Sequence, residues 1–197
     1  INQTLSFQQT SKLISQMFLI LILTIVSLVS SSACEMTLFN PTKYNFTGKV
    51  ALVTGSSSGI GAASAIQLAK YGARVTITGR VEANLAKVAQ QIEQVSGLAP
   101  LQIIGDLLDD SFPKKLIDQT IAEFGQLDFL VNNAGGSTPG GTLASATLLQ
   151  EFDQTLKLNL RSVVELTQRA VHHLEKTKGN IINVSSIASF APVRFEF

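Results

Sequence analysis

The sequence predicts an α/β fold built on a doubly wound parallel sheet that is incomplete at its C-terminal end. Three observations support this fold class. Short apolar runs alternate with helical patterns from Phe46 onward, and a glycine-rich turn directly follows the first apolar run. Hydrophobic residues make up 45% of the chain and charged residues 15%, which suits a sheet buried under helices. Strands that alternate with helices form right-handed βαβ units and therefore a parallel sheet.

The first part of the fold contains three predicted strands and two predicted helices. Glycine follows both helices, at Gly72 and Gly97, as is typical after a helix C-terminus. The second helix carries an apolar stripe at helical spacing, made of Leu85, Val88, Ala89 and Ile92. In chain order the strands and helices are expected at 49–54, 60–71, 74–78, 82–95 and 101–104.

The second part continues the same alternation. A helix is expected after Asp110 and Ser111, with Leu116, Ile117, Thr120, Ile121 and Phe124 facing inward. A Gly/Ser/Pro-rich loop follows the fourth strand, and a single long helix follows this loop. The fourth strand, the loop, the long helix and the fifth strand are expected at 127–131, 135–142, 148–173 and 180–185.

Ligands of such sheets bind beyond the carboxyl ends of the strands. This rule brings residues from distant parts of the sequence to one edge of the sheet. The residues expected there are Gly55, Arg80, Asp106, Asn133 and the pair Ser185-Ser186.

The glycine-rich turn is the run Thr54-Gly55-Ser56-Ser57-Ser58-Gly59-Ile60-Gly61. A strand, a glycine turn and a helix in this order expose backbone N–H groups at the positive end of a helix dipole, where a pyrophosphate can bind. Glycine leaves room for the tight turn and for the close approach of the phosphates. The run lacks the Gly-Lys-Ser/Thr of a nucleoside triphosphatase loop. It therefore indicates a Rossmann-like dinucleotide site and redox chemistry.

Arg80 favours one of the two nicotinamide dinucleotides. NAD-binding sheets usually carry an acid at the end of the second strand, where it holds the ribose 2′-hydroxyl. Here that end is Thr78-Gly79-Arg80 and contains no acid. A guanidinium binds a 2′-phosphate in bidentate fashion, so the sequence predicts NADP(H) over NAD(H). The alternative is an arginine that only faces water.

Together these motifs resemble the short-chain dehydrogenase/reductase family. The resemblance extends over about three-quarters of the chain, from Phe46 to Ala191, and its motifs occur in the family's order. Beside the glycine turn, the matching motifs are Gly105-Asp106-Leu107, Asn132-Asn133-Ala134-Gly135, Lys157-Leu158-Asn159 and Ile182-Asn183-Val184-Ser185-Ser186.

The resemblance implies roles for individual residues. Asp106 would bind the adenine amino group with Leu107 packed on the ring, and the turn at Asn133 would approach the nicotinamide ribose. Ser186 would be the catalytic serine that polarises a substrate carbonyl, and Asn159 would support a proton relay. The implied cofactor-binding residues are Thr54, Gly55, Ser57, Ser58, Gly59, Ile60, Gly61, Arg80, Asp106, Leu107, Asn133, Ala134 and Gly135.

By resemblance the whole protein would transfer a hydride between NADP(H) and a small carbonyl or secondary alcohol, as a homo-oligomer. The family's catalytic Tyr-x-x-x-Lys unit does not occur in this sequence, whose tyrosines are Tyr44 and Tyr71. This absence predicts that the chain as written is inactive and represents a partial enzyme. The alternative is a non-catalytic nucleotide-binding relative of the same fold.

The first 35 residues are expected to be a leader, followed by a partial dinucleotide-binding domain at 46–197. Residues 17–29 are uncharged and apolar, and as a helix they would extend about 20 Å, less than a bilayer core of roughly 30 Å. A secretory signal peptide, a membrane anchor or mistranslated upstream sequence each fit this segment. A start at Met36 predicts a cytoplasmic protein, whereas a start at or before Met17 predicts a secreted or membrane-anchored one.

Other function classes find little support in the sequence. The formal net charge is +1 and there is no basic cluster, so a nucleic-acid partner is not expected. Cys34 is the single cysteine, which excludes an intrachain disulfide. No Cys/His spacing indicates a metal site, and the rings of His172 and His173 are expected to diverge on an exposed helix face.

Overall fold

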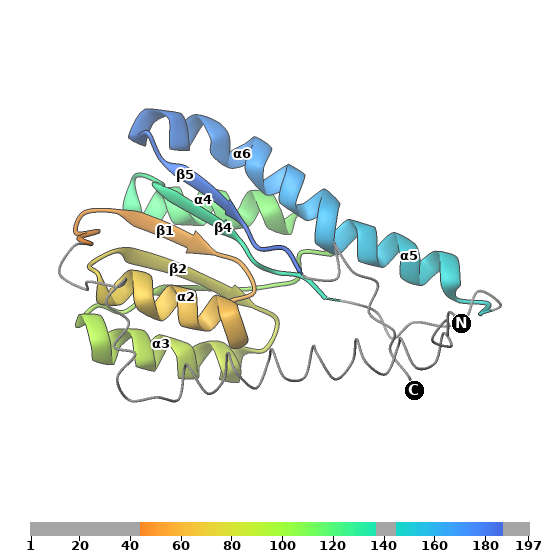
Figure 1. Ribbon diagram of the computed structural model, residues 1–197, viewed down its shortest axis with the longest axis horizontal. Helices are drawn as coiled ribbons and strands as arrows, with labels where there is room; N and C mark the ends of the chain where they lie inside the picture. The colour runs from red at the N-terminus through yellow and green to blue at the C-terminus, as the bar shows by residue number, and fades with distance from the viewer. Residues whose placement is uncertain (1–43, 137–144, 187–197) are drawn as a thin grey trace, which may run out of the picture. The chain divides into compact units, whose positions relative to one another are not determined.

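The computed structural model describes residues 44–136 and 145–186. The helices and strands of these described residues lie within the unit Asn45–Phe197. The strands form one parallel sheet with the order β3-β2-β1-β4-β5, shown in Figure 1. The elements are β1 (Val50–Val53), α2 (Gly59–Lys70), β2 (Arg74–Gly79), α3 (Glu82–Ser96), β3 (Leu101–Ile104), α4 (Phe112–Phe124), β4 (Phe129–Asn132), α5 (Leu148–Leu156), η2 (Lys157–Arg161), α6 (Ser162–Thr177) and β5 (Asn180–Asn183).

The central strand β1 sets the topology. It pairs in parallel with β2 on one side, where Val50 lies opposite Arg74, and with β4 on the other side, where Ala51 lies opposite Phe129. The chain runs outward from β1 through β2 to β3, then crosses back to β4 and continues to β5. The strand order therefore reverses between β1 and β4, and such a switch point is where ligands bind in open α/β sheets. The predicted doubly wound parallel sheet is confirmed.

Two layers of helices cover the sheet. In Figure 1, α2 and α3 lie on one side of the strands and α4 and α6 on the other. Alternate residues of β1 face opposite layers, since Leu52 packs with α4 and α6 whereas Val53 packs with α2 and α3. Small residues let α2 approach the sheet closely, and its buried residues are Gly61, Ala62, Ala65 and Ala69. The predicted α3 stripe of Leu85, Val88, Ala89 and Ile92 is buried as expected.

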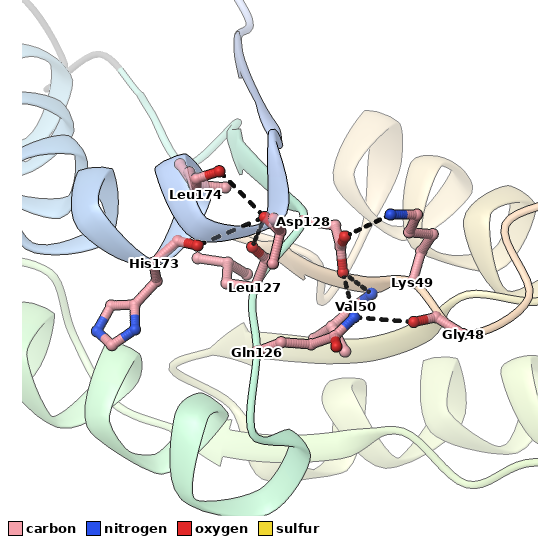
Figure 2. A network of polar contacts seen from close by, with 9 residues as sticks. Gly48, Lys49, Val50, Gln126, Leu127, Asp128, His173 and Leu174 are labelled. Carbon is pink, nitrogen blue, oxygen red and sulfur yellow. Dashed lines mark hydrogen bonds and ion pairs between the residues drawn. The ribbon is translucent and has the colours of Figure 1, made fainter.

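A buried carboxylate joins the amino ends of β1 and β4 (Figure 2). Asp128, only 1% exposed, accepts hydrogen bonds from Lys49 Nζ at 2.8 Å, the Val50 N–H at 2.9 Å and Gln126 Nε2 at 2.7 Å. Burial acts to raise the pKa of Asp128, but the three donors together outweigh burial and the pKa lies below its usual value. The network fixes the edge of the sheet that lies opposite the carboxyl ends of the strands.

The predicted long helix is present but is not a regular α-helix throughout. It begins at Leu148, as expected, and continues to Thr177 rather than His173. Residues Lys157–Arg161 form a π-helical segment between α5 and α6. In this segment the backbone N–H of Ser162 bonds to the Lys157 carbonyl, five residues back, so one additional residue is accommodated in the turn.

Other boundaries differ from the expectations by a residue or two, and β5 ends at Asn183 rather than at residue 185. The predicted leader at 1–35, the apolar segment 17–29 and residues 137–142 of the predicted loop lie outside the described residues. Within the described part of the chain, no helix is both long and apolar enough to span a membrane.

The expectation that the rings of His172 and His173 diverge is wrong. Their centroids lie 4.5 Å apart on α6, with an angle of 33° between the planes. Side-chain rotation brings neighbouring rings together although their Cβ atoms point in different directions around the helix. Desolvation lowers the pKa of His173, and the adjacent charges of His172 and Lys176 lower it further.

Candidate cofactor site

A cleft opens at the carboxyl ends of β1, β2 and β3 and extends to the turn after β4. Eight of the predicted cofactor residues line it, namely Gly55, Ser57, Ser58, Arg80, Asp106, Leu107, Ala134 and Gly135. Five further residues of the lining were not predicted as site residues: Thr78, Gly79, Gly105, Phe112 and Leu158. The topology thus gathers one surface from five separate segments of the sequence.

Two glycines of the glycine turn are required by close packing. Gly55 has a φ of +62°, and a Cβ built there would lie 2.8 Å from the Ala134 Cα atom. A Cβ on Gly61 would lie 2.4 Å from Asn133 Nδ2 and 2.5 Å from the Gly55 carbonyl oxygen. The first turn of α2 and the turn after β4 therefore approach each other more closely than side chains at these positions would permit.

Thr54 and Asn133 hold these two turns together. The Thr54 hydroxyl accepts hydrogen bonds from the backbone N–H groups of Asn133, at 3.0 Å, and Ala134, at 2.9 Å. Asn133 Nδ2 donates to the Thr54 carbonyl oxygen at 2.9 Å. Neither residue is part of the cleft lining. In this structure, these two predicted cofactor residues hydrogen-bond to each other beneath the cleft.

The N-terminus of α2 borders the cleft at Ser58. The Ser58 side chain makes no capping hydrogen bond, and the first turn of the helix carries no acidic residue. Gly59 and Ile60 are exposed and, although predicted as cofactor residues, do not line the cleft. This helix end therefore presents backbone donors and the positive end of its dipole without a competing carboxylate in its own first turn.

Arg80 and Asp106 face each other across the outer rim of the cleft. Arg80 Nη1 lies 3.9 Å from Asp106 Oδ2, and the two side chains are 73% and 40% exposed. Asp106 also accepts a hydrogen bond from the Leu108 N–H at 3.0 Å, which fixes its carboxylate in the turn after β3. A long ion pair between exposed groups contributes little to stability, so Arg80 can reorient toward an anion at low cost.

Phe112 forms an apolar wall that sequence reasoning missed. Its ring is buried at the start of α4 and lies against Gly105, where a Cβ would come within 2.0 Å of Phe112 Cε2. Leu107 is buried beside it in the same cluster. The available signal was Gly105 at the end of the third strand, because glycine at a strand end often marks a close approach.

The two predicted catalytic residues lie outside the cleft lining. The Asn159 side chain clamps the backbone of Gly136, with Oδ1 accepting from the N–H at 2.9 Å and Nδ2 donating to the carbonyl oxygen at 2.8 Å. A Cβ on Gly135 would lie 2.9 Å from Asn159 Oδ1. Ser186 is exposed after the carboxyl end of β5. Among the residues that the structure describes, no group of three or more His, Cys, Asp and Glu side chains is arranged to hold a metal.

Comparison with known proteins gives a consistent result. The family model for short chain dehydrogenases matches residues 49–196. Among curated relatives, the 11-beta-hydroxysteroid dehydrogenase-like 2 of Arabidopsis thaliana is 37% identical over 151 residues, which are 76% of this chain and 48% of the relative. L-fucose dehydrogenase of Rattus norvegicus is 40% identical over 142 residues, 72% of this chain and 50% of the relative. The chain thus spans about half the length of these curated relatives.

Solved structures agree with the sequence comparison. A short chain dehydrogenase from Burkholderia cenocepacia in complex with NADP superposes with a TM-score of 0.70 at 37% identity, covering 76% of this chain and 60% of that one. Glucose dehydrogenase of Caenorhabditis elegans gives a TM-score of 0.63 at 44% identity, covering 73% and 56%. Because the family model matches most of the chain and solved structures superpose on its fold, this protein belongs to the short-chain dehydrogenase/reductase family.

Proposed function

We propose that this chain forms the NADP(H)-binding part of an oxidoreductase that acts on a small carbonyl or secondary alcohol. The observation that carries the proposal is the cleft at the strand switch point, which combines a glycine turn, an uncapped helix N-terminus and a rim arginine. When bound, the nicotinamide cofactor supplies or accepts the hydride. The alternative is a relative of the same fold that binds the nucleotide without turnover.

The residues of the cleft fit such a cofactor. Gly55 lines the cleft without a side chain, and Gly61 lets α2 pack closely against the turn after β4. The N-terminus of α2 offers donors to a pyrophosphate. Leu107 and Phe112 provide apolar surface for an adenine ring, and the neighbouring Asp106 carboxylate would accept a hydrogen bond from the adenine amino group. These features come from two separate segments, the glycine turn with α2 and the stretch from Asp106 to Phe112, so the match does not depend on one motif.

Arg80 supports the choice of NADP(H). Among the described residues that line the cleft, Arg80 is the cationic one. Its guanidinium is available to a 2′-phosphate because its pairing with Asp106 is long and exposed. Neither Thr78 nor Gly79, the residues before it in the lining, is acidic. A carboxylate there would favour the unmodified ribose of NAD(H) and repel the phosphate.

For the chemical step, we assign Ser186 to the substrate oxygen. Its hydroxyl would donate a hydrogen bond to the substrate carbonyl and stabilise the charge that develops there during reduction. Asn159 would support the proton relay, and its clamp on Gly136 would hold the turn that borders the nicotinamide end of the cleft. The proton itself would pass through the family's tyrosine and lysine, which this sequence does not contain.

Nucleotide binding to the full chain tests the proposal. Calorimetric titration with NADP⁺ and NAD⁺ should show tighter binding of NADP⁺. Arg80→Gln should weaken NADP⁺ binding about tenfold, the effect of losing one charge-assisted contact, and leave NAD⁺ binding nearly unchanged. Arg80→Glu should reverse the preference.

The matched control is Arg74→Gln, at the opposite end of β2, where Arg74 is 50% exposed and pairs with Glu123 at 3.7 Å. This control should keep the wild-type preference. If the ratio of NADP⁺ to NAD⁺ affinity is the same in Arg80→Glu as in wild type, the cofactor assignment is refuted. If the wild-type chain binds neither nucleotide, the proposed function as a whole is refuted.

We also propose that the protein acts as a homo-oligomer. An exposed apolar stripe runs along α5, η2 and α6, formed by Leu149, Phe152, Leu156, Leu160 and Val164. The residues recur every three or four positions, the spacing of a helix face that packs against another helix. Asp153 and Arg161 flank Lys157 at equal distances in the sequence and line the same stretch of surface. In an antiparallel dimer whose two-fold axis passes Lys157, Asp153 of one copy would lie opposite Arg161 of the other.

A further inference from the structure

The segment just before β1 contains the tripeptide Asn45-Phe46-Thr47. An asparagine followed two positions later by serine or threonine, with any residue except proline between them, is the acceptor pattern for N-linked glycosylation. The same pattern also occurs at Asn2 and Asn183. Of the three asparagines, Asn45 and Asn183 lie within the described residues, so their surroundings can be compared.

Asn45 lies where the folded chain has room for a glycan. Both Asn45 and Thr47 are exposed. Phe46 between them anchors the segment, because its ring packs edge-on against the rings of Tyr71 and Phe129, with centroids 6.2 Å and 5.3 Å away. Asn45 Oδ1 accepts a hydrogen bond from the Thr47 N–H at 2.9 Å. This bond uses the amide oxygen and not the nitrogen, which is the atom that carries the sugar in an N-linked glycan.

Asn183 has a different environment. It lies in β5 opposite Asn132 of β4. Its side-chain oxygen accepts a hydrogen bond from Asn132 Nδ2 at 2.9 Å, and Asn132 is only 3% exposed. A glycan on the Asn183 amide would have to fit beside this buried amide, which conflicts with the packing of the two strands. Asn45 is therefore the described acceptor pattern that the fold accommodates.

A glycan on Asn45 would leave the cofactor cleft open. Asn45 precedes the amino end of β1, and its neighbour Phe46 packs on Phe129, the first residue of β4. This is the edge of the sheet that the Asp128 network fixes (Figure 2). The cleft begins at Gly55, after the carboxyl end of β1. The two sites thus lie at opposite edges of the sheet.

Glycosylation also requires that the chain enter the secretory lumen, and the sequence upstream of Asn45 contains a segment suited to this. Residues 17–29 are apolar and uncharged, Lys12 precedes them, and the small residues Ser31-Ser32-Ala33 follow. A charged residue, a short apolar run and small residues in this order are typical of a cleaved secretory signal.

We propose that Asn45 is an N-glycosylation site and that residues 17–29 direct the chain into the lumen. The donor is a sugar linked to a lipid diphosphate. The Asn45 amide nitrogen forms a bond to the anomeric carbon of this sugar and gives up a proton to a base of the transferring enzyme. The bond between the anomeric carbon and the diphosphate oxygen breaks, and the lipid diphosphate leaves with the electron pair.

Peptide mass spectrometry on the full chain, produced in insect cells, tests the proposal. Trypsin releases residues 44–49 as one peptide, because Lys43 and Lys49 are its cleavage sites. An amidase that removes N-linked glycans, used in heavy-oxygen water, should convert Asn45 in this peptide to an aspartate that carries the heavy oxygen. Without the amidase, the unmodified peptide should be largely lost, in contrast to the chain produced in bacteria.

Three variants show whether this modification follows the acceptor pattern. Thr47→Ala removes the hydroxyl that the pattern requires and should abolish the modification, whereas Thr47→Ser keeps a hydroxyl and should retain it. Asn40→Gln is the matched control and should leave the glycan in place, because Asn40 is followed by Pro41 and is not an acceptor.

Two results would overturn the proposal. One is recovery of the 44–49 peptide only in its unmodified form from the full chain in insect cells, and the other is a modification of Asn45 that persists in Thr47→Ala. In the first case, replacing residues 1–35 with an established signal peptide identifies the part that failed. A glycan that then appears on Asn45 would place the failure in the leader, and a peptide that stays unmodified would place it in the site itself.

Discussion

At the scale of single residues, the carboxylate of Asp128 shows how one buried charge orders a sheet edge. Three donors from three different residues converge on it at the amino ends of β1 and β4 (Figure 2). The side chain of its partner Lys49 is 45% exposed, so the ammonium is partly hydrated whereas the carboxylate is shielded from water. Replacing the carboxylate with an amide would leave the buried Val50 N–H without its strong hydrogen-bond acceptor.

We therefore expect Asp128→Asn to destabilise the chain by roughly 1–3 kcal/mol, the cost of leaving a buried donor unsatisfied. Chemical denaturation at pH 7 measures this loss. Asp118→Asn, which removes an exposed carboxylate on α4, is the matched control and should change stability little. Equal stability of the two variants would contradict the role given to Asp128.

The lowered pKa of Asp128 also predicts a pH dependence. The folded state holds this carboxyl group ionised at lower pH than the unfolded chain does. Its contribution to stability is therefore complete above the usual value of 3.8 and is lost as the pH falls through the lower, folded-state pKa. Denaturation midpoints from pH 5 downward should fall less steeply in Asp128→Asn than in wild type. Parallel curves would show that other groups account for acid unfolding.

The sequence predicts some residues of the site better than others, for a physical reason. Gly55 and Gly61 were identified because a glycine turn between strand and helix is a local pattern. Phe112 and the Asn159 clamp were not identified, because each depends on a contact with a distant segment, at Gly105 and Gly136 respectively. Sequence motifs marked Thr54 and Asn133 as part of the site but did not show that they bond to each other.

At the scale of elements, the π-helical segment is the feature that sequence periodicity could not predict. The apolar pattern of the long helix remains regular through Lys157–Arg161, so an added residue in one turn leaves no signal. Segments of this kind occur often at functional sites. Here the segment carries Asn159, whose side-chain amide hydrogen-bonds to both the N–H and the carbonyl oxygen of Gly136.

Asn159→Ala should release this turn. The Gly136 N–H would lose its acceptor, so local opening of the turn would no longer require breaking this hydrogen bond. Hydrogen exchange at the Gly136 amide should therefore become about tenfold faster or more. Asn159→Asp keeps an acceptor oxygen but removes the donor to the Gly136 carbonyl, so it should retain part of the protection. Gln154→Ala, an exposed amide on α5, serves as the control. Unchanged exchange at Gly136 in Asn159→Ala would show that the clamp does not order the turn.

At the scale of the whole molecule, the fold class was predictable because every level of the sequence agrees with it. Alternating strands and helices require a parallel sheet, and β1 lies in its centre because the chain returns to pair β4 with it. The burial of the α3 stripe follows from helical spacing alone. The exposure of the stripe on α5, η2 and α6 could not be predicted in this way. An apolar helix face has the same sequence pattern whether the chain itself or another molecule covers it.

This stripe leads to a prediction about assembly. Leu160 is 58% exposed, and Leu160→Glu should convert a dimer to a monomer in analytical ultracentrifugation without lowering the melting temperature. Leu98→Glu is the matched control, since Leu98 is 53% exposed just after α3, away from the stripe. A wild-type chain that sediments as a monomer at all accessible concentrations would contradict the proposed homo-oligomer.

Charge reversal tests the antiparallel orientation separately from assembly itself. Asp153 and Arg161 line the same stretch of the α5–η2–α6 surface, and Lys157 between them already pairs with Asp110 at 2.8 Å. Asp153→Arg and Arg161→Asp should each weaken the dimer, because each places like charges opposite one another in the antiparallel pair. The double variant restores opposite charges at both symmetric contacts, so its dissociation constant should return toward that of wild type. A parallel dimer would place each residue opposite its own copy, and the double variant would then show no recovery relative to the single variants.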